Sequence, residues 1–167
     1  MGHIDPYLCT DLVYSFTVLN ATTYKMEIYD SWFDIDKNGY ADFLALKTLN
    51  PQLKTTIAIG GWDDSHDVTN KYSKMVADAG NRKIFVDSVV EFLQIYKFDG
   101  LDLDWEYPNG DSDKAGFAEL LKELRAALGT TKLLTVAVAA NSTIIDAGIE
   151  FDPFSIHTVN KTGLVIL

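Results

Sequence analysis

Several features that assign proteins to a class are absent or nearly absent from this 167-residue sequence. Its one cysteine, Cys9, cannot form an internal disulfide, and we expect it to be a small buried apolar side chain. No run of about 18 apolar residues occurs, which argues against a transmembrane helix, and residues 1–5 lack the basic and apolar regions of a signal peptide. The histidines are scattered, and no glycine-rich phosphate loop follows a strand. We therefore expect neither a metal nor a cofactor.

Basic residues are scarce as well. The 14 Lys and Arg residues are outnumbered by 24 Asp and Glu residues, so the formal net charge is −10 at pH 7. Such a charge repels phosphate backbones and anionic lipids. We therefore expect no nucleic-acid or membrane partner, whereas a neutral polysaccharide is compatible with this charge. We expect a monomer.

Short apolar runs alternate with longer segments of helical period. We expect strands at residues 12–19, 53–59, 98–105 and 133–140, a short fifth strand at 163–167, and helices at 40–49, 65–79, 82–96 and 114–128. A polar and aromatic connection fills residues 20–38, and Gly80-Asn81 separates the second and third helices. Strands that alternate with helices indicate βα units and a parallel sheet.

The third predicted strand carries a row of acids. Because side chains alternate between the two faces of a strand, Asp102, Asp104 and Glu106 share one face and the apolar residues between them share the other. Three carboxylates spaced about 6–7 Å apart in a poorly solvated place cannot all ionise cheaply, so at least one pKa should rise and make its group a proton donor. Glu106 lies at the C-terminal end, where βα barrels place catalytic groups. The alternatives are an acidic patch and a divalent-metal site.

At these residues the chain resembles chitinases of glycoside hydrolase family 18, whose D-x-x-D-x-D-x-E motif is matched by Asp99, Asp102, Asp104 and Glu106. Ile59-Gly60-Gly61-Trp62 is similar to the family's third-strand motif, and residues 4–16 resemble its second strand and the approach to it.

The resemblance extends from residue 4 to about 148 and implies a partial TIM (β/α)8 barrel. It covers roughly strands 2 to 5 with their helices, and the first strand and the C-terminal strands are missing. Residues 1–167 would form a single incomplete catalytic domain with a divergent tail at 149–167. The first-strand cysteine that pairs with Cys9, the sixth-strand Met-x-Tyr-Asp motif and the eighth-strand tryptophan have no counterpart. A truncated or mispredicted product explains this most simply.

The activity implied by the resemblance is retaining hydrolysis of β-1,4-linked N-acetylglucosamine polymers, assisted by the substrate itself. Glu106 would protonate the leaving oxygen, and the substrate's acetamido group would attack the anomeric carbon. Asp104 would hold that group and share a proton with Asp102. Asp99 has the wrong parity for the row and would support the start of the strand.

Five aromatic residues are candidate sugar contacts, because aromatic faces pack on pyranose rings: Tyr14, Phe16, Trp62, Trp105 and Tyr107. For the first three, packing in the core is an equal alternative. The partner would be chitin or its oligosaccharides.

The missing strands also lead to physical expectations. A sheet cut from a barrel should have two open edges and an exposed inner face. Without the remaining stabilising groups, the chain by itself should have little or no turnover. Three N-x-T sequons, at Asn20, Asn141 and Asn160, favour an extracellular location for a longer protein that contains these residues.

Two other functions are consistent with parts of the sequence. A non-hydrolytic chitooligosaccharide-binding relative is the first, although such proteins usually lack the acid that Glu106 supplies here. A calcium module is the second, since residues 34–42 follow the first positions of an EF-hand loop. Ala45 stands where that loop needs a bidentate glutamate, so we favour a chance match.

Overall fold

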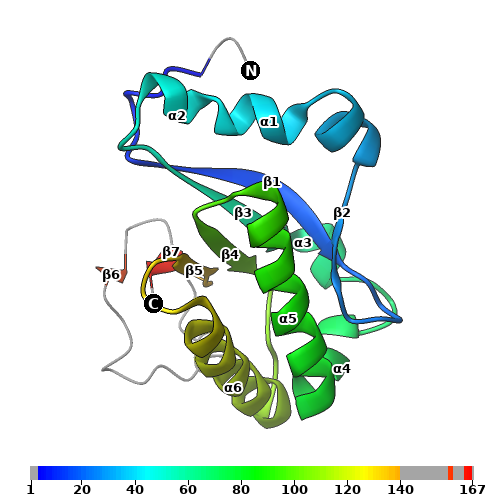
Figure 1. The fold of residues 1–167 in the computed structure, drawn as a ribbon. Coiled ribbons are helices and arrows are strands. Elements are labelled where there is room, and N and C mark those ends of the chain that lie inside the picture. Colours follow the sequence, from blue (N-terminus) through cyan, green and yellow to red (C-terminus); the bar gives the residue numbers. More distant parts are fainter. Residues whose placement is uncertain (1–3, 140–157, 160–163, 167) are drawn as a thin grey trace.

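The structure, a computed structural model, describes residues 4–139, 158–159 and 164–166 (Figure 1). The strands are β1 (Asp11–Leu19), β2 (Met26–Ile28), β3 (Lys54–Gly60), β4 (Gly100–Asp104), β5 (Leu133–Ala137), β6 (Thr158–Val159) and β7 (Leu164–Ile166). The helices are η1 (Trp32–Asp36), α1 (Gly39–Leu44), α2 (Leu46–Leu49), α3 (Trp62–Ser65), α4 (Lys71–Ala77), α5 (Ala79–Tyr96) and α6 (Asp111–Leu128). No helix in the described part of the chain is long and apolar enough to span a membrane.

The strands form one mixed sheet in the order β2-β1-β3-β4-β5-β7-β6. Strands β1, β3, β4 and β5 run parallel, which confirms the predicted α/β class with a parallel sheet. Strand β7 corresponds to the predicted fifth strand but pairs with β5 in the antiparallel direction. Strand β2, inside the segment predicted as a connection, is antiparallel to β1.

The sheet is open, as expected, but its edges within the described residues are β2 and β6 and not the parallel strands. Strand β2 covers the free side of β1, and β7 covers the free side of β5. Three residues at the end of β1 and three of β5 thereby gain strand partners that a parallel sheet of four strands would lack. The antiparallel strands β2 and β7 have only three residues each. Such strands are too short for an alternating pattern of apolar and polar residues to reveal them in the sequence.

The two faces of β3 and β4 differ in chemistry. One face carries fully buried apolar side chains and packs against α4, α5 and α6, which lie together on that side (Figure 1): Ile57, Ile59, Leu101 and Leu103. The opposite face, which we call the inner face, carries small and polar residues: Thr56, Ala58, Gly60, Gly100, Asp102 and Asp104. The strand period of two produces this division, and it confirms the predicted shared face of Asp102 and Asp104.

The inner face is not exposed, contrary to the prediction. Ala58, Asp102 and Thr135 are 1%, 7% and 5% exposed. These residues are register partners across β3, β4 and β5, so their side chains shield one another.

The helices differ from the prediction at several boundaries. Two helices, α1 and α2, occupy the predicted helix 40–49, the predicted helix 65–79 begins only at Lys71 as α4, and α6 begins at Asp111. Gly80 and Asn81 lie inside the first turn of α5 and do not separate two helices. The break falls at Asp78, whose side chain accepts a hydrogen bond from the backbone N–H of Asn81 at 2.9 Å. Asp78 is therefore the N-cap of α5, because a carboxylate at this position satisfies a free amide of the first turn.

Cys9 is exposed, which contradicts the expectation of a buried side chain. It lies in the segment before β1, where Tyr7 and Leu8 are also exposed. This segment lies outside the core, so Cys9 stays exposed although its thiol is weakly polar.

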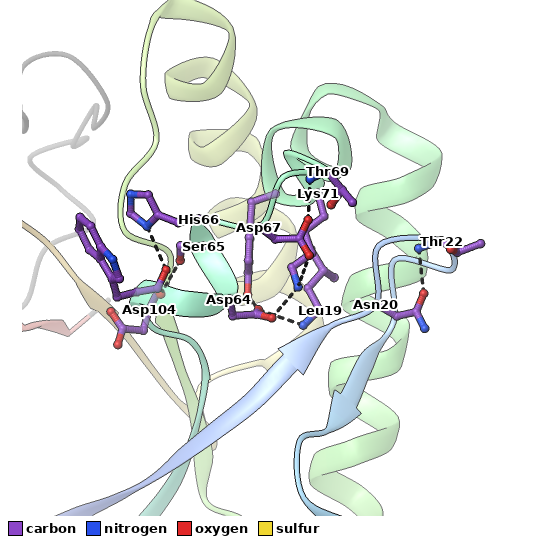
Figure 2. A network of polar contacts seen from close by, with 12 residues as sticks. Leu19, Asn20, Thr22, Asp64, Ser65, His66, Asp67, Thr69, Lys71 and Asp104 are labelled. Carbon is purple, nitrogen blue, oxygen red and sulfur yellow. Dashed lines mark hydrogen bonds and ion pairs between the residues drawn. The ribbon is translucent and has the colours of Figure 1, made fainter.

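Asn20 is the one sequon asparagine within the described residues, since Asn141 and Asn160 lie outside them. Its side-chain oxygen accepts from the backbone N–H of Thr22 (Figure 2) and from that of Thr23, and its amide donates to Glu27. The Asn20 side chain therefore stabilises the turn between β1 and β2.

Candidate active site

The acidic row lies at the C-terminal ends of the parallel strands. Asp102 and Asp104 are on β4, and Glu106 follows two residues after Asp104. Across the sheet, Asp104 is the register partner of Gly60, and Asp102 is the register partner of Thr135. The Thr135 hydroxyl donates to Asp102 Oδ1 at 2.5 Å.

Two carboxyl groups of the row have raised pKa values. Burial, followed by the charges of Glu106 and Asp102, raises the pKa of Asp104 to about 6. Burial also raises the pKa of Asp102, and the hydrogen bond from Thr135 opposes that rise. The expectation that at least one acid of the row is hard to ionise is confirmed, because desolvation and neighbouring like charges both disfavour the carboxylate.

Glu106 is half-buried, and its backbone is held by the turn after β3. Its backbone N–H donates to Ser65 Oγ at 3.0 Å. Burial, the Glu106 charge and a side-chain hydrogen bond with Glu106 raise the pKa of Tyr107. The peptide bonds Ser15–Phe16 and Glu106–Tyr107 are both cis.

The turn after β3 positions the backbone of the acidic row. Gly61 N–H donates to the carbonyl oxygen of Asp104 at 2.8 Å, and the Ser65 hydroxyl lies 3.4 Å from the same oxygen (Figure 2). Ser65 therefore links the carbonyl of Asp104 with the amide of Glu106. Sequence reasoning missed Ser65, although its place three residues after the Gly-Gly-Trp motif puts it at the same sheet edge as the acids.

A buried ion pair anchors this turn. Lys71 Nζ donates to Asp64 Oδ1 at 2.5 Å, and the two side chains are 8% and 7% exposed. The other oxygen of Asp64 accepts from Leu19 N–H at 3.2 Å (Figure 2) and from the Tyr72 hydroxyl at 2.7 Å. One carboxylate thus joins the end of β1, helix α3 and helix α4. Sequence reasoning missed this network, because its charges look like ordinary solvated residues.

Gly60 allows β3 and β4 to approach each other at the site. It has φ +114°, and a Cβ there would lie 2.2 Å from the carbonyl oxygen of Asp104. We expect Gly60→Ala to lower the free energy of unfolding by about 2–3 kcal/mol, through backbone strain and overlap with Asp104.

Gly110→Ala is the matched control for this substitution. Gly110 also has a positive φ, +84°, but no atom lies within 4 Å of its added Cβ, so we expect a loss of about 1 kcal/mol from strain alone. Urea denaturation followed by circular dichroism measures both variants. Equal losses would contradict the steric argument.

A cavity of about 460 Å³ opens at the ends of β1 and β3. Its lining includes Gly60, the register partner of Asp104, but none of the three acids of the row. Phe16, Trp62 and Tyr29 give it an aromatic wall, and Asp63 and Asp67 add carboxylates. Trp62 is 58% exposed. Its ring stacks on His66 at a centroid distance of 3.7 Å, and the Phe16 ring lies beside Gly61. Aromatic surface next to acidic groups suits a ligand with both apolar faces and polar edges, such as a sugar.

Comparison with known proteins decides the family. The family model "Glycosyl hydrolases family 18" matches residues 2–162. The chain belongs to glycosyl hydrolase family 18. The solved structures similar to it include catalytic domain 2 of the Group II chitinase of Ostrinia furnacalis, with a TM-score of 0.83 and 42% identity, covering 89% of this chain and 40% of that one. The sheet described above is therefore a fragment of the TIM barrel of this family.

Other family 18 relatives differ in activity. The endochitinase of Manduca sexta is 42% identical over 139 residues, which are 78% of this chain and 24% of the relative. Human YKL-39, described as a pseudo-chitinase with retained chitooligosaccharide binding, has a TM-score of 0.71 and 33% identity, covering 88% of this chain and 40% of that one. Among five similar curated relatives, the chain spans between 7% and 33% of their length. Homologues in the family bind chitooligosaccharides.

Two of the predicted sugar contacts lie in the core of this family 18 fragment. Trp105 is 4% exposed and packs between Tyr72 and Phe117 on the helix side of the sheet, as its parity opposite the acids requires. Tyr14 is buried against Tyr40. We therefore do not retain Tyr14 or Trp105 as sugar contacts.

Asp99 has the supporting position predicted for it at the start of β4. Burial disfavours its charge, but the Lys47 ammonium and the N–H and hydroxyl of Thr55 more than compensate and hold the pKa of Asp99 below its usual value. Lys47 Nζ lies 2.6 Å from the carboxylate, and Thr55 N–H lies 2.8 Å from it. Asp99 thus ties α2 and β3 to the beginning of β4.

The segment with EF-hand spacing has a structural role instead. Asp34 is buried in η1, where its carboxylate accepts from the Tyr14 hydroxyl at 2.5 Å and from Asp30 N–H at 3.4 Å. Both oxygens of Asp34 therefore have protein partners and face the aromatic core, whereas an EF-hand directs its first ligand to the ion.

Proposed function

We propose that this chain supplies the acid-bearing part of a chitinase active site, which hydrolyses β-1,4-linked N-acetylglucosamine polymers with retention of configuration. The observation that carries the proposal is the row of Asp102, Asp104 and Glu106 at the C-terminal ends of parallel strands. On the neighbouring strand, Gly60, the register partner of Asp104, belongs to the lining of a cavity with an aromatic wall. The raised pKa of Asp104 supports proton sharing within the row, since burial and the charges of Glu106 and Asp102 disfavour its charged form.

Each acid has a distinct role in the proposed mechanism. Glu106, at the open end of the row, protonates the glycosidic oxygen as the bond to the leaving sugar breaks. The acetamido oxygen of the substrate forms the new bond to the anomeric carbon, which replaces the enzyme carboxylate that serves as nucleophile in most retaining glycosidases. Asp104 accepts a hydrogen bond from the acetamido N–H and stabilises the cationic oxazolinium ion, and Asp102 exchanges a proton with Asp104.

Water then opens the oxazolinium ion, and Glu106 removes a proton from that water. Phe16, Trp62 and Tyr107 form the proposed sugar contacts, because the first two line the cavity and Tyr107 lies next to Glu106. The substrate is chitin or its oligosaccharides. A longer protein that carries these residues would act outside the cell.

A non-hydrolytic chitooligosaccharide-binding function is the second candidate, and the structural similarity to the pseudo-chitinase YKL-39 supports it. The row of acids favours hydrolysis, because a protein that only binds sugar has no need of a proton donor at Glu106. For the 167-residue chain alone, however, we expect binding with little or no turnover. The described strands comprise four parallel ones, whereas a barrel of this type has eight.

Chitin pull-down combined with a reducing-end assay separates the two functions. We would test the chain and a chimera in which its residues 4–139 replace the matching segment of the Ostrinia furnacalis domain. The chain should bind chitin without releasing reducing ends, and the chimera should both bind and release them. A folded chimera that binds chitin without cleaving it would favour the binding function, and failure of both proteins to bind would refute the proposal.

A further inference from the structure

We infer that Thr135 is a positioning residue whose hydroxyl keeps the negative charge on Asp102 and thereby leaves the proton of the acidic pair on Asp104. The inference deepens the proposed function, because it assigns the proton within the pair that holds the substrate's acetamido group. Thr135 lies outside the D-x-x-D-x-D-x-E motif, on the neighbouring strand β5.

The geometry of the sheet brings Thr135 to Asp102. The two residues are register partners in parallel strands, so their side chains emerge on the same face and next to each other. Thr135 Oγ1 donates to Asp102 Oδ1 at 2.5 Å, and the residues are 5% and 7% exposed. Water therefore has little access to this carboxylate, and the hydroxyl is its built-in donor.

The opposite neighbour of Asp102 offers no comparable group. On the β3 side its register partner is Ala58, whose methyl group cannot form a hydrogen bond. Thr17, nearby on β1, donates its hydroxyl to the backbone carbonyl of Ala58 at 2.8 Å. Among register partners of Asp102, Thr135 is thus the one whose side chain can stabilise its charge.

A donor at Asp102 controls the proton on Asp104 through electrostatics. A hydrogen bond to a carboxylate favours its charged form, and the donation from Thr135 opposes the rise that burial causes in the pKa of Asp102. An ionised Asp102 in turn helps to raise the pKa of Asp104 to about 6, after burial and the charge of Glu106. Two acids so closely coupled share protons as a pair.

Three other titratable groups interact electrostatically with Asp104, and all three are unchanged in the variants compared below. Glu106 contributes its charge to Asp104. The hydroxyls of Tyr72 and Tyr107 both feel the charge of Asp104, and their pKa values lie above the ordinary value for tyrosine. None of the three is a partner of Thr135, so replacing Thr135 changes the donor to Asp102 alone.

The test is a pH titration of the Asp102 and Asp104 carboxyl carbons by NMR, on the 167-residue chain with ¹³C-labelled aspartate. We compare wild type with Thr135→Val, which keeps the shape and removes the hydroxyl, and with Thr135→Ser, which restores it. Asp104→Asn and Asp102→Asn assign the two signals. In Thr135→Val we expect about a tenfold gain in proton affinity at Asp102 and a fall at Asp104. Thr135→Ser should titrate like wild type.

Titration curves in Thr135→Val that match wild type would overturn the inference, and so would a Thr135→Ser protein that titrates like the valine variant. Circular dichroism establishes that each variant is folded, and Thr135→Ala replaces the valine variant if that one does not fold. The titration needs no substrate. Failure to bind chitin would therefore refute the proposed function but not the proton assignment. Unchanged titration curves would refute the proton assignment but not the proposed function.

Discussion

Replacing Glu106 with glutamine is expected to lower the rate of chitooligosaccharide cleavage by about 10²–10⁴-fold, because the amide cannot donate a proton to the leaving oxygen. The change preserves shape and the position set by the hydrogen bond from Glu106 N–H to Ser65. Binding should therefore change little, so that kcat falls and KM does not rise. The measurement is release of reducing ends by the chimera described above.

Glu91→Gln is the control for this experiment. Glu91 is exposed on helix α5 and lies outside the acidic row. The same charge is removed from the protein, so a long-range effect of net charge would appear in both variants. Cleavage by Glu106→Gln at the rate of Glu91→Gln would rule out Glu106 as the acid.

Replacing Lys71 with methionine is expected to lower the free energy of unfolding by about 3–5 kcal/mol, which is typical when one partner of a buried ion pair is removed. Methionine preserves most of the volume but leaves the Asp64 carboxylate buried with only the Tyr72 hydroxyl and the Leu19 N–H as donors. Urea denaturation of the 167-residue chain measures the effect.

Lys83→Met provides the comparison. Lys83 pairs with Asp87 at 2.6 Å, but the two side chains are 74% and 64% exposed, so we expect a change of about 0.5 kcal/mol or less. Similar stabilities for the two variants would show that the Lys71–Asp64 pair contributes no more than a surface pair. The difference also bears on the site, because Asp64 lies next to Ser65, whose hydroxyl accepts from Glu106 N–H.

The alternation of acidic and apolar residues predicted much of the candidate site, because the direction of each side chain in a strand depends only on its position along that strand. The alternation in residues 98–106 placed the acids on one face and Leu101 and Leu103 on the other. The odd parity of Asp99 correctly separated it from the row, and its contacts with Lys47 and Thr55 explain why it supports the start of β4.

Sequence reasoning failed where burial depends on distant partners. Trp105 was predicted to contact sugar because it is aromatic, and for Tyr14 sugar contact and core packing were equal alternatives. Their surroundings come from helices and strands elsewhere in the chain, which bury both residues. Cys9 failed in the opposite direction, since it lies in an exposed segment before β1. Residue type sets a tendency toward burial, but the packing of the whole fold decides it.

The sequence by itself determined the βα alternation, the inward row of acids and the Gly-Gly turn beside it, because the side-chain period of a strand and the freedom of glycine are properties of short segments. Tertiary structure alone decided which groups these acids meet. Thr135 reaches Asp102 from β5, and Lys71 reaches Asp64 from α4. Desolvation and charge act through space, so the pKa of about 6 at Asp104 arises only when the strands assemble.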